Sequence, residues 1–145
     1  MKHFIMIKES VSIAIFDGQR KQIIAVQRPA DDEDLANAWG LPASSLLENE
    51  SIEDAVIRTG KEKLGVELEP IKALESGHIE RSTYRLEMTL YEAKIIEGEC
   101  TVPQPISGIT QYQQWQWGDA SCFMPAAEKG SLCCRLFLKY NNKAG

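Results

Sequence analysis

Residues 44–66 of this chain, SSLLENESIEDAVIRTGKEKLGV, decide its fold. Ser51 followed three residues later by Asp54 is the pattern of a helix N-terminus, where the serine side chain caps free backbone N–H groups. Apolar and small side chains then recur at the spacing of one helical face, at Ile52, Ala55, Val56 and Thr59. Gly65 ends the run. The stretch therefore predicts an amphipathic helix from about residue 52 to residue 64.

Two extended segments and an irregular stretch lie on the N-terminal side of this helix. Residues 11–15 alternate apolar with smaller or polar side chains, Asp17-Gly18 offers a turn, and residues 22–27 form a second extended run. We predict a β-hairpin from these three parts. Pro29 to Asn37 is acidic and irregular, and Trp39-Gly40-Leu41-Pro42 ends in a proline that favours an extended backbone before it.

Further extended segments and a last helix are predicted on the C-terminal side. Residues 66–74, 82–96 and 111–117 have the alternation or the composition of strands. Ser131 suits a helix cap, and the apolar stripe behind it consists of Leu132, Cys133, Leu136, Phe137 and Tyr140. The order of strands and helices favours a mixed sheet covered by helices, because each element has one apolar face to bury.

The composition is that of a single soluble domain over residues 1–145. Hydrophobic residues make up 43% and charged residues 26%, which argues against a disordered chain. The apolar run of residues 4–7 is too short for a membrane span or a signal peptide, so we expect a cytoplasmic protein without a membrane partner. A net charge of -5 without a basic block argues against polymeric nucleic acid as partner. We interpret the cysteines, at 100, 122, 133 and 134, as reduced structural thiols.

Residues 44–66 resemble the Nudix box, the signature of enzymes that hydrolyse a nucleoside diphosphate linked to another group. The box is written G-x5-E-x7-R-E-U-x-E-E-x-G-U, with U aliphatic. The residues that occupy their places in it are Glu50, Arg58, Glu62, Gly65 and Val66. Trp39-Gly40-Leu41-Pro42 resembles the W-x-L-P lead-in of the family, and Trp117 resembles the tryptophan that ends its late strand. The resemblance implies an α/β fold, a Nudix-like α/β/α sandwich with a mixed central β-sheet.

The same resemblance implies a function and a site. The expected activity is a Nudix-type hydrolase that cleaves the diphosphate linkage of a nucleoside diphosphate derivative with Mg²⁺ or Mn²⁺. Glu62 and Glu50 are implied as metal ligands, and Arg58 as the residue that orients Glu50, so that all three count as catalytic. A divalent ion would neutralise the diphosphate and activate water. The expected partner is a small-molecule nucleotide, and a homodimer is left open.

The box is degenerate at four positions. Ser44 replaces glycine, Thr59 the first helix glutamate, Gly60 the aliphatic residue and Lys63 the last glutamate. The three places where glutamates would converge on a metal, 59, 62 and 63, carry formal charges of 0, -1 and +1, hence 0 in total against -3 for three glutamates. We therefore expect a weakly held metal and weak or atypical hydrolysis. Gly60 in mid-helix is expected to cost about 1 kcal/mol relative to alanine.

Two other functions compete with this hypothesis. The first is a non-catalytic nucleotide-binding or regulatory module that keeps the fold while the missing carboxylates mark lost chemistry. The second is an isomerase of prenyl diphosphates, which shares the general fold, but the chain has no pair of Cys and Glu at positions that would indicate it. Turnover of a nucleoside diphosphate derivative separates hydrolysis from the binding module. Specificity in the family lies in variable loops, here residues 29–37 and 97–110.

Some side chains keep two interpretations. Lys63 either places an ammonium where a metal would sit or faces solvent at the helix end, and we favour the second. Trp115 and Trp117 either stack on a base or pack in the core, and core packing is favoured. The general base is unassigned: the stretch before Trp117 offers the neutral Gln111, Gln113 and Gln114, with Glu97 and Glu99 as nearby alternatives. His78 receives no role.

Overall fold

The computed structural model describes residues 6–32, 34–104 and 112–144. Within these residues the strands are β1 Met6–Ala14, β2 Ile23–Gln27, β3 Trp39–Gly40, β4 Ala43–Ser45, β5 Glu67–Glu80, β6 Tyr84–Glu97 and β7 Trp115–Gly118. The α-helices in the same ranges are α1 Ile52–Thr59, α2 Ala120–Glu128 and α3 Leu132–Ala144, and η1 Gly60–Leu64 is a π-helical turn that continues α1. The strands form two sheets, in the orders β4-β1-β6-β5 and β3-β2-β7.

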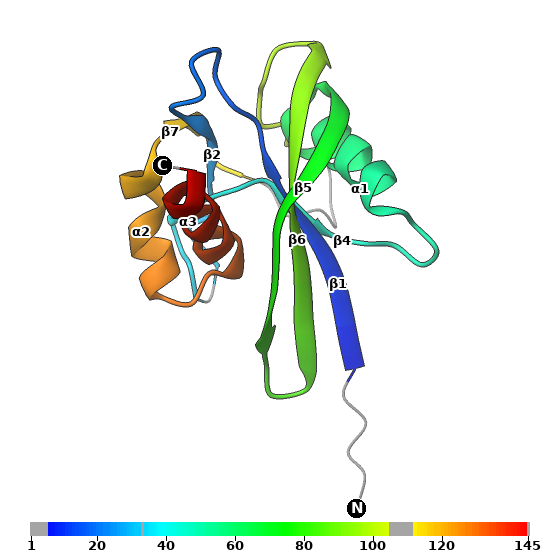
Figure 1. Ribbon diagram of the computed structural model, residues 1–145, viewed down its shortest axis with the longest axis vertical. Coiled ribbons are helices and arrows are strands. Elements are labelled where there is room, and N and C mark those ends of the chain that lie inside the picture. Colours follow the sequence, from blue (N-terminus) through cyan, green and yellow to red (C-terminus); the bar gives the residue numbers. More distant parts are fainter. Residues whose placement is uncertain (1–5, 33, 105–111, 145) are drawn as a thin grey trace, which may run out of the picture.

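The four-stranded sheet is mixed, as predicted. β1 runs parallel to β6 and antiparallel to β4, so that Val11 lies opposite both Thr89 and Ser44. β5 and β6 form a long antiparallel pair that ends in a tight connection (Figure 1). β1 thus has a neighbouring strand on each edge. The loop that follows β4 leads into α1.

The predicted N-terminal hairpin is wrong in its pairing, although its turn forms. The two arms meet only at an isolated antiparallel bridge between Phe16 and Ile23, and Asp17 accepts backbone N–H groups of the turn. Beyond that bridge β1 enters the four-stranded sheet and β2 enters the other sheet. The arms diverge because both edges of β1 are taken by β4 and β6, so no edge remains for β2.

The sheets lie between helices, which confirms the α/β/α sandwich. Figure 1 shows α1 on one side of the β1-β6-β5 layer and α2 with α3 on the other. One apolar cluster joins α1 to the strands through Val56, Val11 and Ile24, and a second joins α2 and α3 through Phe123, Phe137 and Leu90. Burial of both helix faces against the strands is the main stabilising term for such an arrangement.

The helix predicted for residues 52–64 is confirmed, with a different last turn. The hydroxyl of Ser51 accepts a hydrogen bond from the backbone N–H of Asp54 at 3.1 Å, and Gly65 ends the helix in the left-handed conformation with φ of 67°. Between them α1 passes at Gly60 into the wider π turn η1. Such π turns are rare and occur preferentially at functional sites.

The C-terminal part contains one helix that was predicted and one that was not. α3 buries its expected stripe, including Leu136 and Phe137. α2 was not predicted, and it contains Pro125 in its interior, where proline normally breaks a helix. Asp119, whose side chain accepts the backbone N–H of Ser121 at 3.0 Å, was the signal for its start. Among the described residues, no helix has the length and apolar character needed to cross a bilayer.

Candidate functional site

α1 presents two different faces at the box. Ala55, Val56 and Thr59 are buried against the strands, whereas Arg58 and Glu62 lie one turn apart on the outer face. This division follows from the helical period, since residues three and four apart share a face. The polar face of the helix therefore carries the residues available for chemistry.

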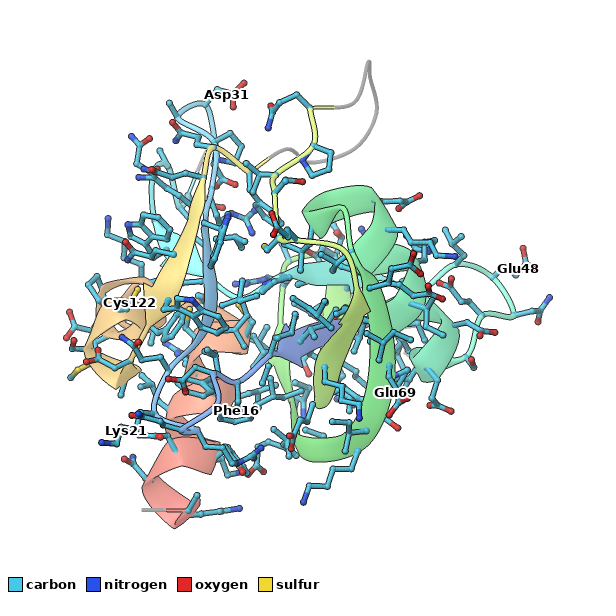
Figure 2. All side chains as sticks on the ribbon, turned by 90° about the horizontal axis from the view of Figure 1, so that it is seen from above. Phe16, Lys21, Asp31, Glu48, Glu69 and Cys122 are labelled. Carbon is cyan, nitrogen blue, oxygen red and sulfur yellow. The ribbon has the colours of Figure 1, made fainter. Side chains whose placement is uncertain are left out.

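Arg58 joins the helix to the loop before it. Its guanidinium donates to both carboxylate oxygens of Glu50 at 2.9 Å, to Glu62 Oε1 at 3.0 Å and to the carbonyl of Ser45 at 2.9 Å. The hydrogen bonds from Arg58 lower the pKa of Glu50, and those carboxylates raise the pKa of Arg58. Glu48, by contrast, points into solvent from the projecting loop (Figure 2). The predicted contact between Arg58 and Glu50 is thus present, and Glu62 joins it.

Thr59 occupies the place of the first box glutamate but points into the interior. Its side chain is fully buried, and its hydroxyl lies 2.6 Å from the carbonyl oxygen of Ala55 and 2.9 Å from the hydroxyl of Ser44. Because a hydroxyl has one proton to give, it donates to Ala55 and accepts from Ser44. The two residues that replace family glycine and glutamate are therefore bonded to each other.

The structure explains why glycine, and not a larger residue, occupies position 60. A Cβ atom at this position would lie 2.6 Å from Leu68 Cγ and 3.2 Å from the carbonyl oxygen of Val66. Carbon atoms do not approach so closely, so alanine would force Leu68 or the helix to shift. The expectation that alanine would be better here by about 1 kcal/mol is therefore wrong, because that figure applies to exposed helix positions.

Lys63 does not face solvent, which corrects the interpretation favoured from sequence. Its side chain turns inward, and its Nζ donates to the carbonyl oxygen of Ala43 at 2.5 Å. The ammonium also lies 5.6 Å from the ring centre of Tyr112. Burial lowers the pKa of Lys63 to about 8; the nearby cations Arg28 and Arg58 lower it further, and Glu62 opposes them. The long aliphatic stem explains the difference, since it packs in the interior while the ammonium reaches a carbonyl oxygen.

The box does not make a three-carboxylate metal site. Thr59 is buried and neutral, Lys63 is a cation, and Glu62 shares Arg58 with Glu50. Among the described residues, no group of three or more His, Cys, Asp or Glu side chains is placed to hold an ion. Magnesium prefers six oxygen ligands and needs carboxylates to offset its charge. The residues present therefore fall short of a resident Mg²⁺ or Mn²⁺ site.

A cleft of about 820 Å³ opens beside the box. Ala43 lies at its edge, so the same residue that accepts the ammonium of Lys63 also lines the cleft. Arg28 follows β2 and faces the cleft, with two of its nitrogens on Asp32 Oδ2 at 2.8 and 2.7 Å. The other walls come from the loop after β2, from the β5-β6 hairpin, and from the connection between α2 and α3 with the start of α3. They include Asp34, Leu35, Tyr84, Leu86, Lys129, Ser131 and Cys133.

Sequence reasoning missed two residues of this site. Arg28 was overlooked although it comes directly after a buried strand, where side chains often reach a binding site. Tyr112 was overlooked because it lies within a stretch interpreted as strand. Its hydroxyl accepts the backbone N–H of Ala43 at 3.1 Å, and burial raises the pKa of Tyr112 to about 12. The ring of Tyr112 lies 5.6 Å from the Lys63 ammonium, and Arg28 is near enough to act on its charge.

Other predicted candidates lie elsewhere. Gln113 and Gln114 hydrogen-bond to Asn37 and Gln27 in the strands and loop around β2, and Gln111 lies outside the described residues. In the described ranges, neither Glu97 nor Glu99 hydrogen-bonds to a box residue. The general base therefore stays unassigned.

The two tryptophans of β7 differ in their exposure. Trp115 packs against the apolar cluster under α1, as favoured, whereas Trp117 is 39% exposed. Their rings meet edge to face with centres 5.9 Å apart. Trp117 is therefore the more exposed of the two, and Trp115 is partly buried.

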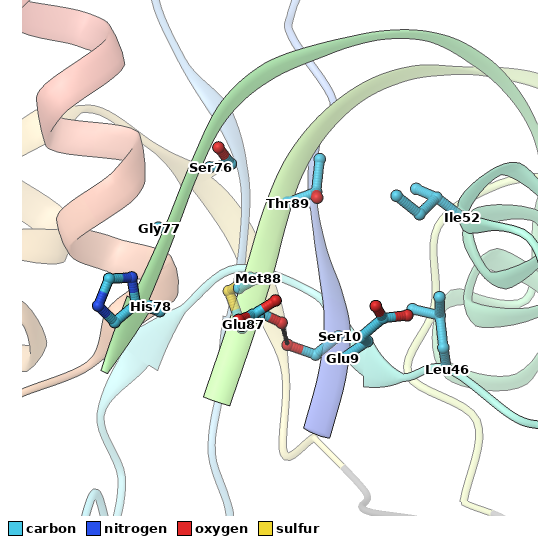
Figure 3. Close-up of a pocket in the computed structure, with 10 residues that line it drawn as sticks. All are labelled: Glu9, Ser10, Leu46, Ile52, Ser76, Gly77, His78, Glu87, Met88 and Thr89. Carbon is cyan, nitrogen blue, oxygen red and sulfur yellow. Dashed lines mark hydrogen bonds between the residues drawn. The ribbon is translucent and has the colours of Figure 1, made fainter. Parts of the chain in front are cut away.

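A smaller cavity of about 320 Å³ lies on the four-stranded sheet (Figure 3). Glu9, Glu87 and His78 stand side by side on β1, β6 and β5, because Glu87 is paired with both of the others. Ser10 donates to the carbonyl of Glu87 at 3.3 Å. Ile52 of the box helix lines this cavity, and Met88 lines both this cavity and the larger cleft.

Comparison with known proteins agrees with this geometry. A family model described as NUDIX domain matches residues 6–100. No curated protein sequence matches the chain. Similar solved structures include the E. coli ORF135 protein, with a TM-score of 0.71, 18% identity and coverage of 94% of this chain and 92% of that one.

Two further structures extend the likeness. A MutT NUDIX hydrolase from Burkholderia pseudomallei has a TM-score of 0.66 at 24% identity, over 80% of this chain and 85% of its own. An ADP-ribose pyrophosphatase from Streptococcus suis has a TM-score of 0.56 at 20% identity, over 79% and 75%. At such identities the likeness shows a shared fold. Together with the family match over residues 6–100, it shows that this chain belongs to the NUDIX domain family.

Proposed function

We propose that this protein is a Nudix-type hydrolase that takes a nucleoside diphosphate derivative in the cleft beside Ala43 and cleaves its diphosphate linkage slowly. One observation carries this proposal: Ala43 lines the cleft and also accepts the ammonium of Lys63 from the box, so a ligand in the cleft lies next to the box. The intact contacts of Arg58 with Glu50 and Glu62 support it. The replaced glutamates are the reason for slow turnover.

The proposed roles follow from these contacts. Glu62 and Glu50 are the remaining carboxylates for a weakly held Mg²⁺ or Mn²⁺, and Arg58 positions both. Glu62 is the better candidate because Arg58 binds one of its oxygens, whereas both oxygens of Glu50 are engaged. The ligand is a small-molecule nucleotide; the net charge of -5 argues against polymeric nucleic acid. We place the protein in the cytoplasm, where free thiols such as the buried Cys133 and Cys134 persist.

A second candidate is a non-catalytic nucleotide-binding or regulatory module. The hydrogen bond from Lys63 Nζ to the carbonyl of Ala43 favours it, because the ammonium stands within the array where a third carboxylate would be. In this candidate the same cleft holds the same class of ligand, and no bond is broken.

Turnover separates the two candidates. A panel of nucleoside diphosphate derivatives, including ADP-ribose, is incubated with Mg²⁺ or Mn²⁺, and the release of phosphate-containing products is followed by chromatography. Slow release that Glu62→Gln abolishes supports the hydrolase. Glu53→Gln is the matched control, since Glu53 is exposed on the same helix. Binding without release from any member of the panel supports the module, and unchanged release by Glu62→Gln removes Glu62 from the proposed mechanism.

A further inference from the structure

We propose that the ammonium of Lys63, together with Arg28, receives the diphosphate of the ligand without a divalent ion. This inference rests on the proposed function for its ligand class, a nucleoside diphosphate derivative. It differs from that proposal in assigning the role of the cation to two side chains of this protein. Binding and metal dependence are thereby separated.

Lys63 is held in place, yet its charge is not neutralised. The carbonyl of Ala43 accepts one of its N–H groups, and a carbonyl carries no net charge. In the part of the chain that the structure describes, no carboxylate lies within 4.0 Å of its Nζ. Glu62, the nearest acidic residue in sequence, pairs instead with Arg58. An ammonium has three donors, so Lys63 retains capacity for a ligand anion.

Arg28 reaches the same cleft with a donor to spare. It lines the cleft, and Asp32 accepts from its Nε and Nη2 at 2.8 and 2.7 Å. A guanidinium has five N–H donors, and among the described residues the Nη1 of Arg28 has no hydrogen-bond partner. Arg28 therefore retains capacity for a ligand anion although its charge is offset by Asp32.

The ammonium is also pre-positioned. Tyr112 is buried, and its hydroxyl hydrogen-bonds to the backbone of Ala43 in β4, the residue that accepts the ammonium of Lys63. The ring of Tyr112 adds a favourable cation–π contact, at 5.6 Å from Nζ. Since side chains that are already ordered lose little entropy on binding, this arrangement suits a ligand site.

Charge arithmetic compares this site with the ordinary box. Three glutamates sum to -3, and a divalent ion of +2 leaves -1. Thr59, Glu62 and Lys63 sum to 0 without an ion. Without a metal, these three positions of this protein carry a formal charge of 0. The ordinary site carries -1 even when a divalent ion is bound. Two phosphate groups therefore meet less repulsion at the box. The charged residues that line the cleft are Arg28, Arg81, Lys129, Asp32 and Asp34, which sum to +3 - 2 = +1, with Arg28 and Asp32 paired to each other.

Calorimetric titration of the full chain with ADP-ribose and with inorganic pyrophosphate tests the inference. Binding by the wild type is expected to be equal, within about twofold, in EDTA and in Mg²⁺. Lys63→Met should weaken binding about tenfold to hundredfold in EDTA, the loss of one or two charge-assisted hydrogen bonds. Lys61→Met, an exposed lysine of the same helical turn, should leave affinity unchanged. Circular dichroism confirms that each variant is folded.

Lys63→Glu provides the reciprocal arm. It should abolish binding in EDTA and restore part of it when Mg²⁺ or Mn²⁺ is added. Wild-type binding that requires a metal, or Lys63→Met that binds as the wild type does, overturns the inference and leaves the proposed function standing. Absence of binding under every condition overturns the ligand class itself. Binding in EDTA that depends on Lys63, without any turnover, upholds the inference and supports the non-catalytic candidate.

Discussion

Arg58 donates two hydrogen bonds to the carboxylate of Glu50, from Nε to Oε2 and from Nη2 to Oε1, each 2.9 Å long. The side chain of Arg58 is 22% exposed and that of Glu50 is 12% exposed, so this pair is shielded from bulk water. Eight residues separate the two in sequence, and their contact closes the loop between β4 and α1 onto the helix. This ion pair therefore positions the loop before α1, and Arg58 also positions Glu62.

Arg58→Ala should therefore destabilise the fold by roughly 1–3 kcal/mol, because the half-buried Glu50 would lose two charge-assisted hydrogen bonds. Urea unfolding followed by circular dichroism measures the effect. Arg85→Ala is the control, since Arg85 pairs with the well-exposed Glu80 and should have a much smaller effect on stability. Equal losses in both variants would show that the Arg58 pair is no stronger than a surface contact.

Lys63 predicts a rise in stability at alkaline pH. Its pKa is lowered by burial from 10.5 to about 8. Between these values the unfolded chain binds a proton that the folded chain does not, so the free energy of unfolding increases with pH. Lys63→Met removes this contribution. The variant should exceed the wild type in stability at pH 7 by on the order of 1–3 kcal/mol, and this excess should shrink as the pH approaches 10.5.

Urea unfolding of the wild type and of Lys63→Met at a series of pH values measures that difference. Lys61→Met reports the behaviour of an exposed lysine of the same turn, and its difference from the wild type should not vary with pH. A constant difference for Lys63→Met as well would mean that the ammonium is not desolvated.

Gly60→Ala should destabilise the protein by about 1–3 kcal/mol, because the added Cβ overlaps Leu68. Leu68→Ala creates room, so the double variant should lose less than the sum of the two single losses. A double-mutant cycle on thermal unfolding gives the coupling energy. Gly18→Ala, where nothing lies within 4 Å, should be near neutral. Strict additivity would show that the helix shifts to accommodate alanine without touching Leu68.

Restoring the box glutamates should have unequal effects. Lys63→Glu replaces a cation by a carboxylate beside Glu62 and Ala43, so Mn²⁺ affinity, followed by electron paramagnetic resonance, should rise about tenfold or more. Thr59→Glu buries a carboxylate where Thr59 is fully enclosed, so it should cost stability. The double variant should bind metal best if it folds. Unchanged metal affinity in all three would indicate that the geometry of the Ser44 loop is limiting.

Local patterns in the sequence predicted the elements that depend on near neighbours. The cap at Ser51 and the stop at Gly65 act through bonds within a few residues, so both could be recognised directly. The contact of Arg58 with Glu50 was predicted because the family pattern fixes both positions. The pairing of β1 could not be predicted in the same way, because its partners β4 and β6 lie far along the chain. The sequence around α2 carries opposing local signals: Asp119 favours a helix start, whereas Pro125 disfavours a helix interior.

The sequence by itself determined that residues 52–64 form a helix, that the chain has the mixed α/β architecture of the Nudix box, and that the three metal positions sum to zero charge. Only the tertiary structure decided where that charge lies. Lys63 turns inward to Ala43, Thr59 is enclosed with Ser44, and Leu68 excludes any side chain at Gly60. The reason is that formal charge is a property of residue type, whereas burial and close contact depend on segments that meet only in the folded chain.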